Sequence, residues 1–224
     1  MSYRPICDTW ILARPKVKWY GAYPSGFLER GRALLGVMPQ DAVLHVCGGR
    51  ARDYPFRGFG PNDVTLDADP NLKPDILADV NDLIPLQGHR PTVWDADTGR
   101  VCLAYGGRPW PAILADPAYS VEDQANYDVG AELYPEPRKL LADCLRAVRP
   151  GGRVGFLHYI WPRPPAPSIG FKTRSVAVIT VLMGFGNRGR LFSVYERLGD
   201  DINTTSTPVD KSQSRPLVMR GRRR

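Results

Sequence analysis

Hydrophobic positions along the chain follow two alternating patterns. Short continuous apolar runs bounded by glycine or acidic residues, such as "DAVLHVCGG" at residues 41–49, are typical of strands buried on both faces. Leucines that repeat on one face, as in "PEPRKLLADCLRAVRPGG" at residues 135–152, indicate a helix, here with a Pro-Gly-Gly stop. The same patterns predict a helix at residues 24–36 and strands at 62–69, 73–83, 111–115 and 153–160, followed by two strands joined by a Gly-rich turn within 175–198.

The helix expected at residues 24–36 has recognisable ends. Ser25 is a candidate cap for its first turn, and Gly36 is suited to stopping it. Its apolar face consists of Phe27, Leu28, Leu34 and Leu35.

The order of these elements predicts the fold class. Strands that alternate with helices and end in a strand pair form an α/β sandwich with a mostly parallel sheet. Residues 92–107 alternate around Asp97-Thr98-Gly99 and predict a β-hairpin, within an insertion at about residues 86–110. We therefore expect one domain over residues 1–198 and a polar, disordered tail over residues 199–224.

Positive charge is concentrated in the last residues of the sequence. The net charge is +7, and residues 211–224 contain six Lys and Arg and no acid, so the first 210 residues carry a net charge of only +1. A tail that ends in Arg-Gly-Arg-Arg-Arg is suited to attracting a polyanion such as nucleic acid. The same tail is equally consistent with a solvated terminus.

Cysteine and histidine give little sign of a metal site. The four cysteines are widely spaced, none forms a CxxC motif, and the three histidines are scattered, so we expect no metal. His45 is expected in the core, whereas His158 ends a strand and is a candidate pocket residue. The longest apolar run, residues 176–185, is too short to span a bilayer, and no basic-then-apolar leader begins the sequence. We therefore expect a reduced, cytoplasmic protein.

Candidate binding residues follow the predicted strands at their carboxyl ends, where open α/β sheets bind ligands. Cys47, Gly48 and Gly49 follow the first strand of the alternating series, and glycine lets the backbone turn tightly and approach a ligand closely. A full GxGxxG motif is absent, so a plain turn is the alternative. Asp67 closes the next strand at about the spacing from which a carboxylate reaches a ribose hydroxyl. Asp69 competes for that role, and either acid is also suited to capping the next turn.

The third and fourth strands also end in carboxylates. Asp79 is placed where a side chain can accept a hydrogen bond from an adenine amino group, with a surface acid as the alternative interpretation. The fourth strand ends in Asp116-Pro117-Ala118-Tyr119. This stretch is either a proline-containing turn or a pocket for a flat substrate.

The chemistry of a base pocket explains these residue types. An exocyclic amine of adenine or cytosine is a poor nucleophile, because its lone pair is delocalised into the ring. A carboxylate from Asp116 and a backbone carbonyl, presented by a loop that Pro117 stiffens, can accept both amine hydrogens and make the nitrogen more nucleophilic. Tyr119 offers a flat face on which the base can stack. A base in a duplex must first be flipped out, at a free-energy cost of roughly a few kcal/mol.

In order along the chain, "LHVCGG", "VTLDADPNLKPDILADVNDL" and "ILADPAY" resemble the motif series of class I S-adenosylmethionine-dependent methyltransferases. They are similar in particular to the amino-methyltransferases of DNA, whose fourth motif is Asp/Asn-Pro-Pro-Tyr/Phe. The stretches "KWYGAYPSGFLERGRALL" and "LRAVRPGGRVGFLH" resemble the segments that precede and follow these motifs in the family. The resemblance covers roughly residues 18–198 and departs from the family at Ala118, where the family has proline.

This resemblance implies a Rossmann-like class I methyltransferase sandwich with a C-terminal antiparallel strand pair. It implies S-adenosylmethionine as cofactor and methyl transfer to an exocyclic amino group of a nucleic-acid base, with DNA adenine N6 ahead of cytosine N4. Asp116, Pro117 and Tyr119 are the implied catalytic residues. The residues implied to contact the cofactor are Tyr20, Gly21, Cys47, Gly48, Gly49, Asp67, Asp79 and Asp116.

Two segments are candidates for contact with nucleic acid. The expected loop "YIWPRPPAPSIGFKTR" at residues 159–174 mixes aromatic and basic side chains, which suits a nucleic-acid strand but also an ordinary proline-stiffened loop. The stretch "NRGR" at residues 187–190 adds two candidate phosphate contacts. The residues predicted to bind nucleic acid are Trp161, Lys172, Arg174, Arg188 and Arg190.

Other functions stay open at this point. RNA, protein side chains and small molecules are also methylated on this fold, and the fold does not choose among them. The chain has no room for the separate recognition domain of larger DNA methyltransferases. Together with Ala118, this leaves open a degenerate methyltransferase fold that binds nucleic acid without catalysis. A homo-oligomer or a separate partner is the alternative source of target recognition.

Overall fold

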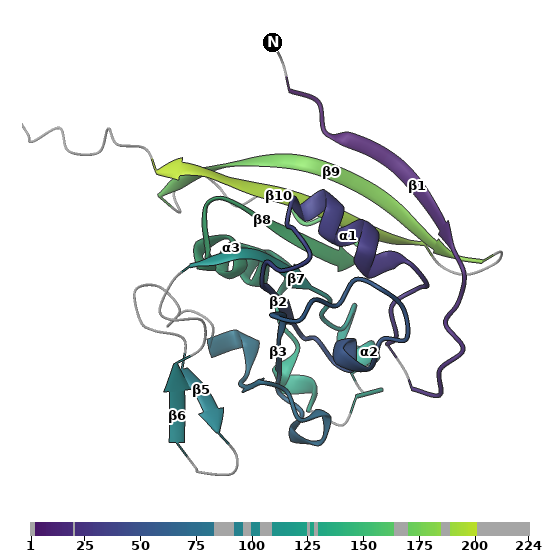
Figure 1. Ribbon diagram of the computed structural model, residues 1–224, viewed down its shortest axis with the longest axis vertical. Helices are drawn as coiled ribbons and strands as arrows, with labels where there is room; N and C mark the ends of the chain where they lie inside the picture. The colour runs from purple at the N-terminus through teal and green to yellow at the C-terminus, as the bar shows by residue number, and fades with distance from the viewer. Residues whose placement is uncertain are drawn as a thin grey trace, which may run out of the picture.

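A sheet of eight strands organises the chain, in the order β1-β9-β10-β8-β7-β2-β3-β4 (Figure 1). The computed structural model describes residues 3–19, 21–82, 92–95, 100–103, 109–124, 126–127, 130–163, 170–184 and 189–200. The strands of this sheet are β1 (Ile6–Leu12), β2 (Val43–Val46), β3 (Val64–Asp67), β4 (Ile76–Leu77), β7 (Trp110–Ala115), β8 (Val148–His158), β9 (Phe171–Met183) and β10 (Arg190–Asp200). The α-helices are α1 (Phe27–Leu35), α2 (Val121–Gln124) and α3 (Pro137–Ala147), and the short 3₁₀ helices are η1 (Ala51–Asp53), η2 (Pro70–Leu72), η3 (Val80–Asp82) and η6 (Ala131–Leu133).

The sheet is mostly parallel, as predicted. Only β10 runs against its neighbours, because it pairs antiparallel with both β8 and β9, while the other adjacent strands of the sheet pair parallel. From β2 the chain builds outward through β3 to β4, then returns to β7 on the other side of β2 and continues to β8. This is the Rossmann-like α/β sheet with a C-terminal antiparallel pair that was expected. Its topological switch point lies between β2 and β7, where such sheets bind ligands.

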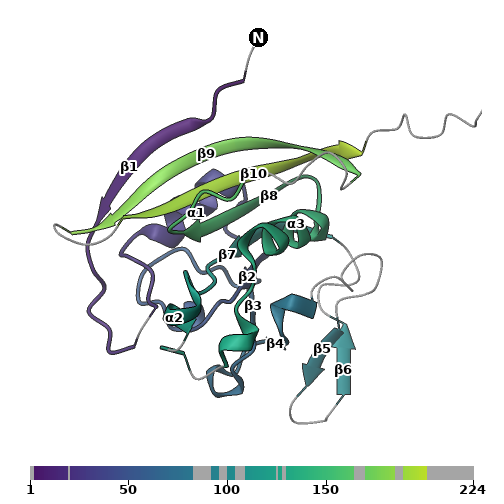
Figure 2. The ribbon, with the colours of Figure 1, turned by 180° about the vertical axis from the view of Figure 1, so that it is seen from behind.

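The two long helices cover opposite faces of the sheet. Helix α1 lies in front of the sheet in Figure 1, and α3 lies in front of it in the reverse view of Figure 2. On β7, Ile113 belongs to the apolar cluster that contains the leucines of α3, whereas its neighbour Leu114 belongs to the cluster with Phe27 of α1. This alternation explains why β7 reads as a continuous apolar run, since both faces of the strand are buried.

The predicted ends of α1 are half correct. Gly36 ends the helix in the left-handed conformation, with a φ angle of 69°, as expected of a glycine stop. The expected cap at Ser25 is wrong. Gly26 occupies the cap position without a side-chain hydrogen bond, and the Ser25 N–H instead donates to the Ala13 carbonyl oxygen at 2.9 Å.

The second long helix is shorter than the predicted range of 135–152. Pro137 occupies its first turn, and the Glu136 carboxylate accepts hydrogen bonds from the N–H groups of Arg138 and Lys139. The Pro-Gly-Gly sequence does not follow the helix directly, because Val148 already pairs with Trp110 of β7 and begins β8.

Two further elements qualify the sequence predictions. The expected hairpin is confirmed as β5 (Thr92–Asp95) and β6 (Arg100–Leu103), which pair antiparallel as a separate two-stranded sheet. Strand β1 was not predicted. It is an edge strand of which only Trp10 and Leu12 are buried, so its apolar pattern is weak. None of the helices in the described part of the chain is both long and apolar enough to cross a membrane.

Candidate functional site

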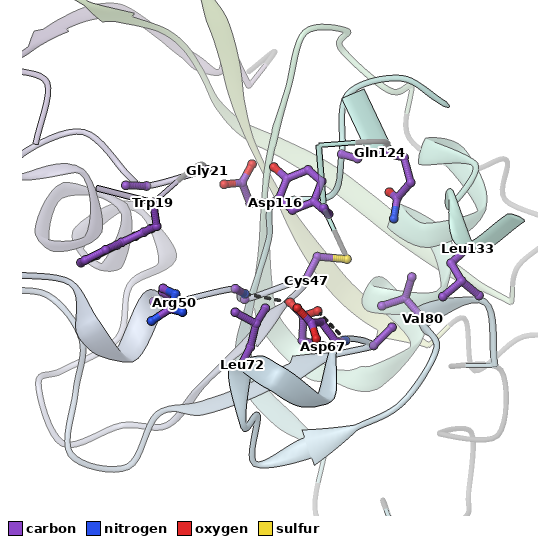
Figure 3. Close-up of a pocket in the computed structure, with 18 of the residues that line it drawn as sticks. Trp19, Gly21, Cys47, Arg50, Asp67, Leu72, Val80, Asp116, Gln124 and Leu133 are labelled. Carbon is purple, nitrogen blue, oxygen red and sulfur yellow. Dashed lines mark hydrogen bonds between the residues drawn. The ribbon is translucent and has the colours of Figure 1, made fainter. Parts of the chain in front are cut away.

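A cavity opens at the carboxyl ends of β2, β3 and β7, and we call it the first cavity (Figure 3). It encloses about 920 Å³ of space between the atoms, its open mouth included. The predicted cofactor residues that line it are Gly21, Cys47, Gly48, Gly49, Asp67, Asp79 and Asp116. Tyr20, the remaining predicted residue, lies outside the described residues.

The turn after β2 has a backbone that requires small residues. Cys47 and Gly49 have positive φ angles of 52° and 50°, a backbone conformation that residues other than glycine rarely adopt. A Cβ on Gly48 would lie 2.9 Å from the His45 carbonyl oxygen, whereas one on Gly49 would meet nothing within 4 Å. The turn is therefore tight at Gly48 and leaves open space at Gly49, where a ligand can approach the backbone.

Asp67 connects the end of β3 to this turn. Its Oδ2 accepts a hydrogen bond from the Gly49 N–H at 2.8 Å, and its Oδ1 accepts one from the Asp69 N–H at 3.1 Å. Burial raises the pKa of Asp67, and the backbone hydrogen bonds oppose this shift. Asp69 accepts from the Asn71 N–H at 2.8 Å and caps η2. Both acids line the cavity, but Asp67 organises the glycine turn while Asp69 caps the helix.

Asp79 forms another part of the same wall. It is half-buried, and its Oδ1 accepts a hydrogen bond from the Asn81 N–H at 2.8 Å at the start of η3. The buried side chain of Val80 lines the cavity beside it. Figure 3 shows Asp67 and Asp116 on opposite sides of Cys47 in this view, so carboxylates from separate strands face one space.

Asp116 enters the cavity where β2 and β7 end. Its N–H donates to the Val46 carbonyl oxygen at 3.1 Å and extends the strand pairing by one residue. The Asp116 Oδ1 accepts a hydrogen bond from the Tyr119 hydroxyl at 2.8 Å, and that hydroxyl accepts one from Arg190 Nη1 at 2.8 Å. A chain of hydrogen bonds therefore runs from Arg190, at the start of β10, through Tyr119 to Asp116.

The protonation of Asp116 follows from these surroundings. Burial raises the pKa of Asp116 to about 6, while the positive charge of Arg190 and the hydrogen bond from Tyr119 both lower it. The carboxyl group is thus largely ionised at neutral pH but close to its titration range. A carboxylate with such a pKa can accept a proton during a reaction near pH 7.

The Tyr119 ring is enclosed by other side chains. Tyr159 is tilted against it at 4.4 Å between ring centroids, His158 meets it edge-on at 5.4 Å, and the Arg190 guanidinium lies 5.5 Å from its centre. His158, a candidate pocket residue, lines neither this cavity nor the second cavity described below. Burial lowers the pKa of His158 to about 4, so this side chain is neutral at pH 7 and supports the Tyr119 ring.

A second cavity adjoins the first on the far side of Tyr119. It encloses about 1060 Å³ with its mouth, and it shares Trp19, Gly21, Ala22 and Tyr127 with the first cavity. The residues found only in its own lining are Arg14, Pro15, Val17, Tyr119, Tyr159, Met183 and Arg190. Two cavities joined by shared walls suit a reaction between two ligands, one of which is held beside Asp116.

The residues predicted to bind nucleic acid do not form one site. Lys172 and Arg174 lie at the start of strand β9 and not in a loop. The loop predicted over residues 159–174 was therefore too long, because its last residues belong to this strand. Met183, which lines the second cavity, ends the same strand, so Arg174 lies about 30 Å away along it. Arg174 forms an ion pair with Glu196 at 2.7 Å.

The other three predicted residues have different positions. Trp161 is half-exposed and lines neither cavity. Arg188 lies outside the described residues. Arg190 is buried, its Nη1 is bonded to Tyr119, and it lines the second cavity. A nucleic-acid role for Trp161, Lys172, Arg174, Arg188 and Arg190 therefore stays a prediction.

Sequence reasoning missed the hydrogen-bond chain and the segment at residues 13–19. Arg190 and Tyr119 are far apart in sequence, and only the return of β10 beside β8 brings them together. Segment 13–19 supplies Arg14, Val17 and Trp19 to the second cavity, and the aromatic and basic residues in "RPKVKW" were the available signal. In the described parts of the chain, no three His, Cys, Asp or Glu side chains are grouped as a metal site would require.

The chain matches no protein-family model and no curated protein sequence. Among solved structures it is similar to TrmN from Thermus thermophilus, with a TM-score of 0.45 and 18% identity over 80% of this chain and 50% of that one. It is also similar to an rRNA methylase from Streptococcus thermophilus, with a TM-score of 0.42 and 13% identity over 77% of this chain and 97% of the other. The N-methyltransferase NodS from Bradyrhizobium japonicum WM9 gives a TM-score of 0.41 and 13% identity over the same shares.

The chain spans half the length of TrmN. At such low identities and TM-scores these similarities do not transfer an activity. The fold assignment therefore rests on the strand order and directions of the sheet itself.

Proposed function

We propose that the chain transfers a methyl group from S-adenosylmethionine to an exocyclic amino group of a nucleic-acid base, with adenine N6 of DNA as the first candidate. The observation that carries the proposal is the position of Asp116. It lies in the wall of the first cavity and is hydrogen-bonded to Tyr119, which lines the second. This carboxylate therefore lies between the first cavity and the residue that forms a wall of the second.

The first cavity fits a nucleoside cofactor. The open side of Gly49 admits close approach to the backbone, and each carboxylate oxygen of Asp67 retains a lone pair for a ribose hydroxyl beyond its backbone hydrogen bond. Asp79 Oδ2 is suited to accepting from an adenine amino group at the far wall. S-adenosylmethionine, when bound, supplies a methyl group on a positively charged sulfur.

The second cavity would hold the acceptor. Trp19, Tyr119, Tyr127 and Tyr159 give it aromatic walls, which suit a flat base. With the base in place, Asp116 Oδ2 and the Pro117 carbonyl oxygen would accept the two amine hydrogens. These two acceptors would make the nitrogen a better nucleophile, and holding it close to the methyl donor would supply much of the rate.

Proton balance assigns a further role to Asp116. In such a transfer the nitrogen–carbon bond would form as the carbon–sulfur bond of the cofactor breaks with its electron pair left on sulfur, and the methylated nitrogen would have to lose one proton. The ionised Asp116 carboxylate is positioned to accept it, and a pKa of about 6 allows release of the proton to solvent at neutral pH.

The structure modifies the expected role of Tyr119. Its hydroxyl holds Asp116 Oδ1, so the residue orients the carboxylate as well as forming an aromatic wall. Ala118, the departure from the family motif, is buried in the first-cavity wall. Because the carboxylate is oriented by Tyr119 and Arg190, the geometry at Asp116 does not depend on a proline at position 118.

A calorimetric titration with S-adenosylmethionine, followed by incubation with double-stranded DNA and mass analysis of its nucleosides, tests the proposal. We expect saturable cofactor binding and the appearance of N6-methyladenine. N4-methylcytosine would change the base, and methylated RNA in a parallel incubation would change the nucleic acid. Cofactor binding with no methylated nucleoside of either kind would contradict the acceptor, and the absence of cofactor binding would contradict the function as a whole.

A further inference from the structure

Basic side chains surround the outer side of the second cavity. Segment 13–19 alternates between two environments: Arg14, Lys16 and Lys18 are exposed, whereas Pro15 is buried and Val17 is half-buried. Pro15, Val17 and Trp19 line the second cavity, and Arg14 reaches its rim. The segment therefore places three cations outward from the same stretch of backbone that forms the cavity wall.

These three cations are available to a ligand. Among the described residues, Arg14, Lys16 and Lys18 form no ion pair, in contrast to Arg174, which is paired with Glu196. The described residues that line the second cavity include two arginines and no carboxylate. The rim of the cavity, where Arg14, Lys16 and Lys18 lie, is thus electrostatically suited to an anion.

The spacing of the cations suits a chain of negative charges. They occur at every second residue, which separates successive Cα atoms by at most about 7 Å. The residue before a proline prefers an extended backbone, so Pro15 favours an extended conformation at Arg14. A row of cations beside an aromatic-lined cavity is the arrangement that nucleic-acid strands bind, with phosphates on the cations and a base on the aromatic rings.

We propose that segment 13–19 binds the phosphates of a single nucleic-acid strand through Arg14, Lys16 and Lys18 and directs one base into the second cavity. The proposal rests on the proposed function for the identity of that cavity as the acceptor site. It differs from the sequence-based prediction, because Lys172 and Arg174 lie at the other end of β9. It also assigns single-stranded or flipped-out nucleic acid as the form that is bound.

Fluorescence anisotropy with a labelled single-stranded oligonucleotide, measured over a range of salt concentrations, tests this inference. The test variant carries Arg14→Gln, Lys16→Gln and Lys18→Gln. The matched control carries Arg57→Gln, Arg138→Gln and Arg149→Gln, which removes the same charge from exposed residues that line neither cavity. Both variants keep the basic C-terminal residues, so any contribution from those is the same in each.

We expect the test variant to bind at least tenfold more weakly than the wild type at moderate salt. The slope of log K against log salt should fall by about 2, since each phosphate contact on a single strand contributes roughly 0.7. The slope of the control variant should differ from the wild-type slope by less than the contribution of one phosphate contact, roughly 0.7. Equal losses in the two variants, no loss in either, or no oligonucleotide binding by the wild type would overturn the inference. A polyglutamate peptide that competes as well as the oligonucleotide would also overturn it.

This experiment separates the inference from the proposed function. Cofactor binding is measured on the same samples by calorimetry and should be unchanged in all three proteins. Oligonucleotide binding that depends on the segment, without any methylated product, would support the inference and contradict the proposed function. If the test variant forms methylated product and binds the oligonucleotide as tightly as the wild type, the proposed function would be supported and the inference about segment 13–19 contradicted.

Discussion

Asp63 and Asp116 are two aspartates at opposite ends of the parallel strands, and their surroundings differ. Asp63 directly precedes β3 and is buried. Its carboxylate accepts from Arg32 Nη1 at 2.7 and 2.8 Å, from the N–H groups of Val43 and Gly60, and is paired with His45 Nε2 at 3.1 Å. Asp116 follows β7 and, within the described part of the chain, receives a single side-chain hydrogen bond, from Tyr119.

These different surroundings shift the pKa values of the two aspartates in opposite directions. Burial would raise the pKa of Asp63, but the hydrogen bond and charge of His45 and the hydrogen bonds from the Gly60 N–H and Arg32 outweigh it and lower the pKa. For Asp116 burial prevails, and the pKa rises to about 6. A carboxylate whose lone pairs are satisfied by the protein stabilises the fold, whereas one that keeps unused hydrogen-bonding capacity beside a cavity is available for chemistry.

The largest expected effect is on activity. Asp116→Asn should reduce methyl transfer by about 10²- to 10⁴-fold, because the amide cannot accept a proton, while affinity for S-adenosylmethionine changes little. Single-turnover methylation assays and calorimetry measure the two quantities. Asp123→Asn, on neighbouring helix α2 and outside both cavity linings, is the matched control. Parallel loss of cofactor binding and transfer would mean that Asp116 belongs to the cofactor site alone.

The next effect is on stability. Asp63→Asn should lower the free energy of unfolding by about 3–5 kcal/mol, since it leaves the buried Arg32 guanidinium without its negative partner. Urea titration followed by circular dichroism provides the measurement. Asp53→Asn, which removes an exposed pair with Arg50, should cost less than about 1 kcal/mol. Similar losses in both variants would remove the distinction between Asp63 and an ordinary surface acid.

Arg190→Met tests the hydrogen-bond chain. Without the guanidinium the pKa of Asp116 should rise further, so the acidic limb of the pH profile of kcat/KM should move to higher pH by about one unit. Arg190→Lys retains the charge and should move the limb less. A lower rate with an unmoved limb in both variants would show that Arg190 only fills space.

The smallest expected effect is on the pH dependence of stability, which should have opposite signs for Asp116 and Asp63. The pKa of Asp116 is about 6 in the folded chain against an ordinary value of 3.8, so its ionisation destabilises the fold as pH rises through this window and by a constant amount above it. The Asp116→Asn variant should therefore be more stable than the wild type at about pH 8. We expect a gain on the order of 1 kcal/mol and no more, because water screens the charge of this half-buried group. The gain should vanish near pH 4.

Asp63 should show the opposite behaviour. Its lowered pKa stabilises the fold above the ordinary value, and this stabilisation is lost as pH falls through the folded-state pKa. The deficit of Asp63→Asn should thus shrink in acid. Unfolding curves for both variants across pH test the pair, and a shared direction of change would refute the contrast.

The sheet and the cofactor-side residues were predictable for a simple reason. The carboxyl ends of parallel strands meet at one edge, so the residues after each apolar run had to converge. Asp67, Asp79 and Asp116 therefore line one cavity, as the strand pattern indicates. Short strands such as β4, with two residues, were expected to be longer because flanking apolar residues continue the pattern without pairing.

The second cavity was less predictable, because its lining depends on contacts between distant segments. Nothing local to Arg190 indicates that its guanidinium is buried against Tyr119, since the sequence pattern there is that of a turn rich in glycine and arginine. Likewise, Lys172 and Arg174 were assigned to a loop, although β9 begins at Phe171, which is buried. Hydrogen-bond partners and strand boundaries that are set by tertiary pairing leave little signal in the local amino-acid composition.

The pairing of β1 with β9 also concerns the order in which the chain is made. Residues 6–12 are synthesised before the other described strands, yet their partner, residues 177–183, is among the last of those strands to be synthesised. The strands β2, β3, β7 and β8 can assemble earlier, and they carry most of the first cavity. A growing chain would therefore form most of the first cavity before β9 and Arg190 are available to complete the second.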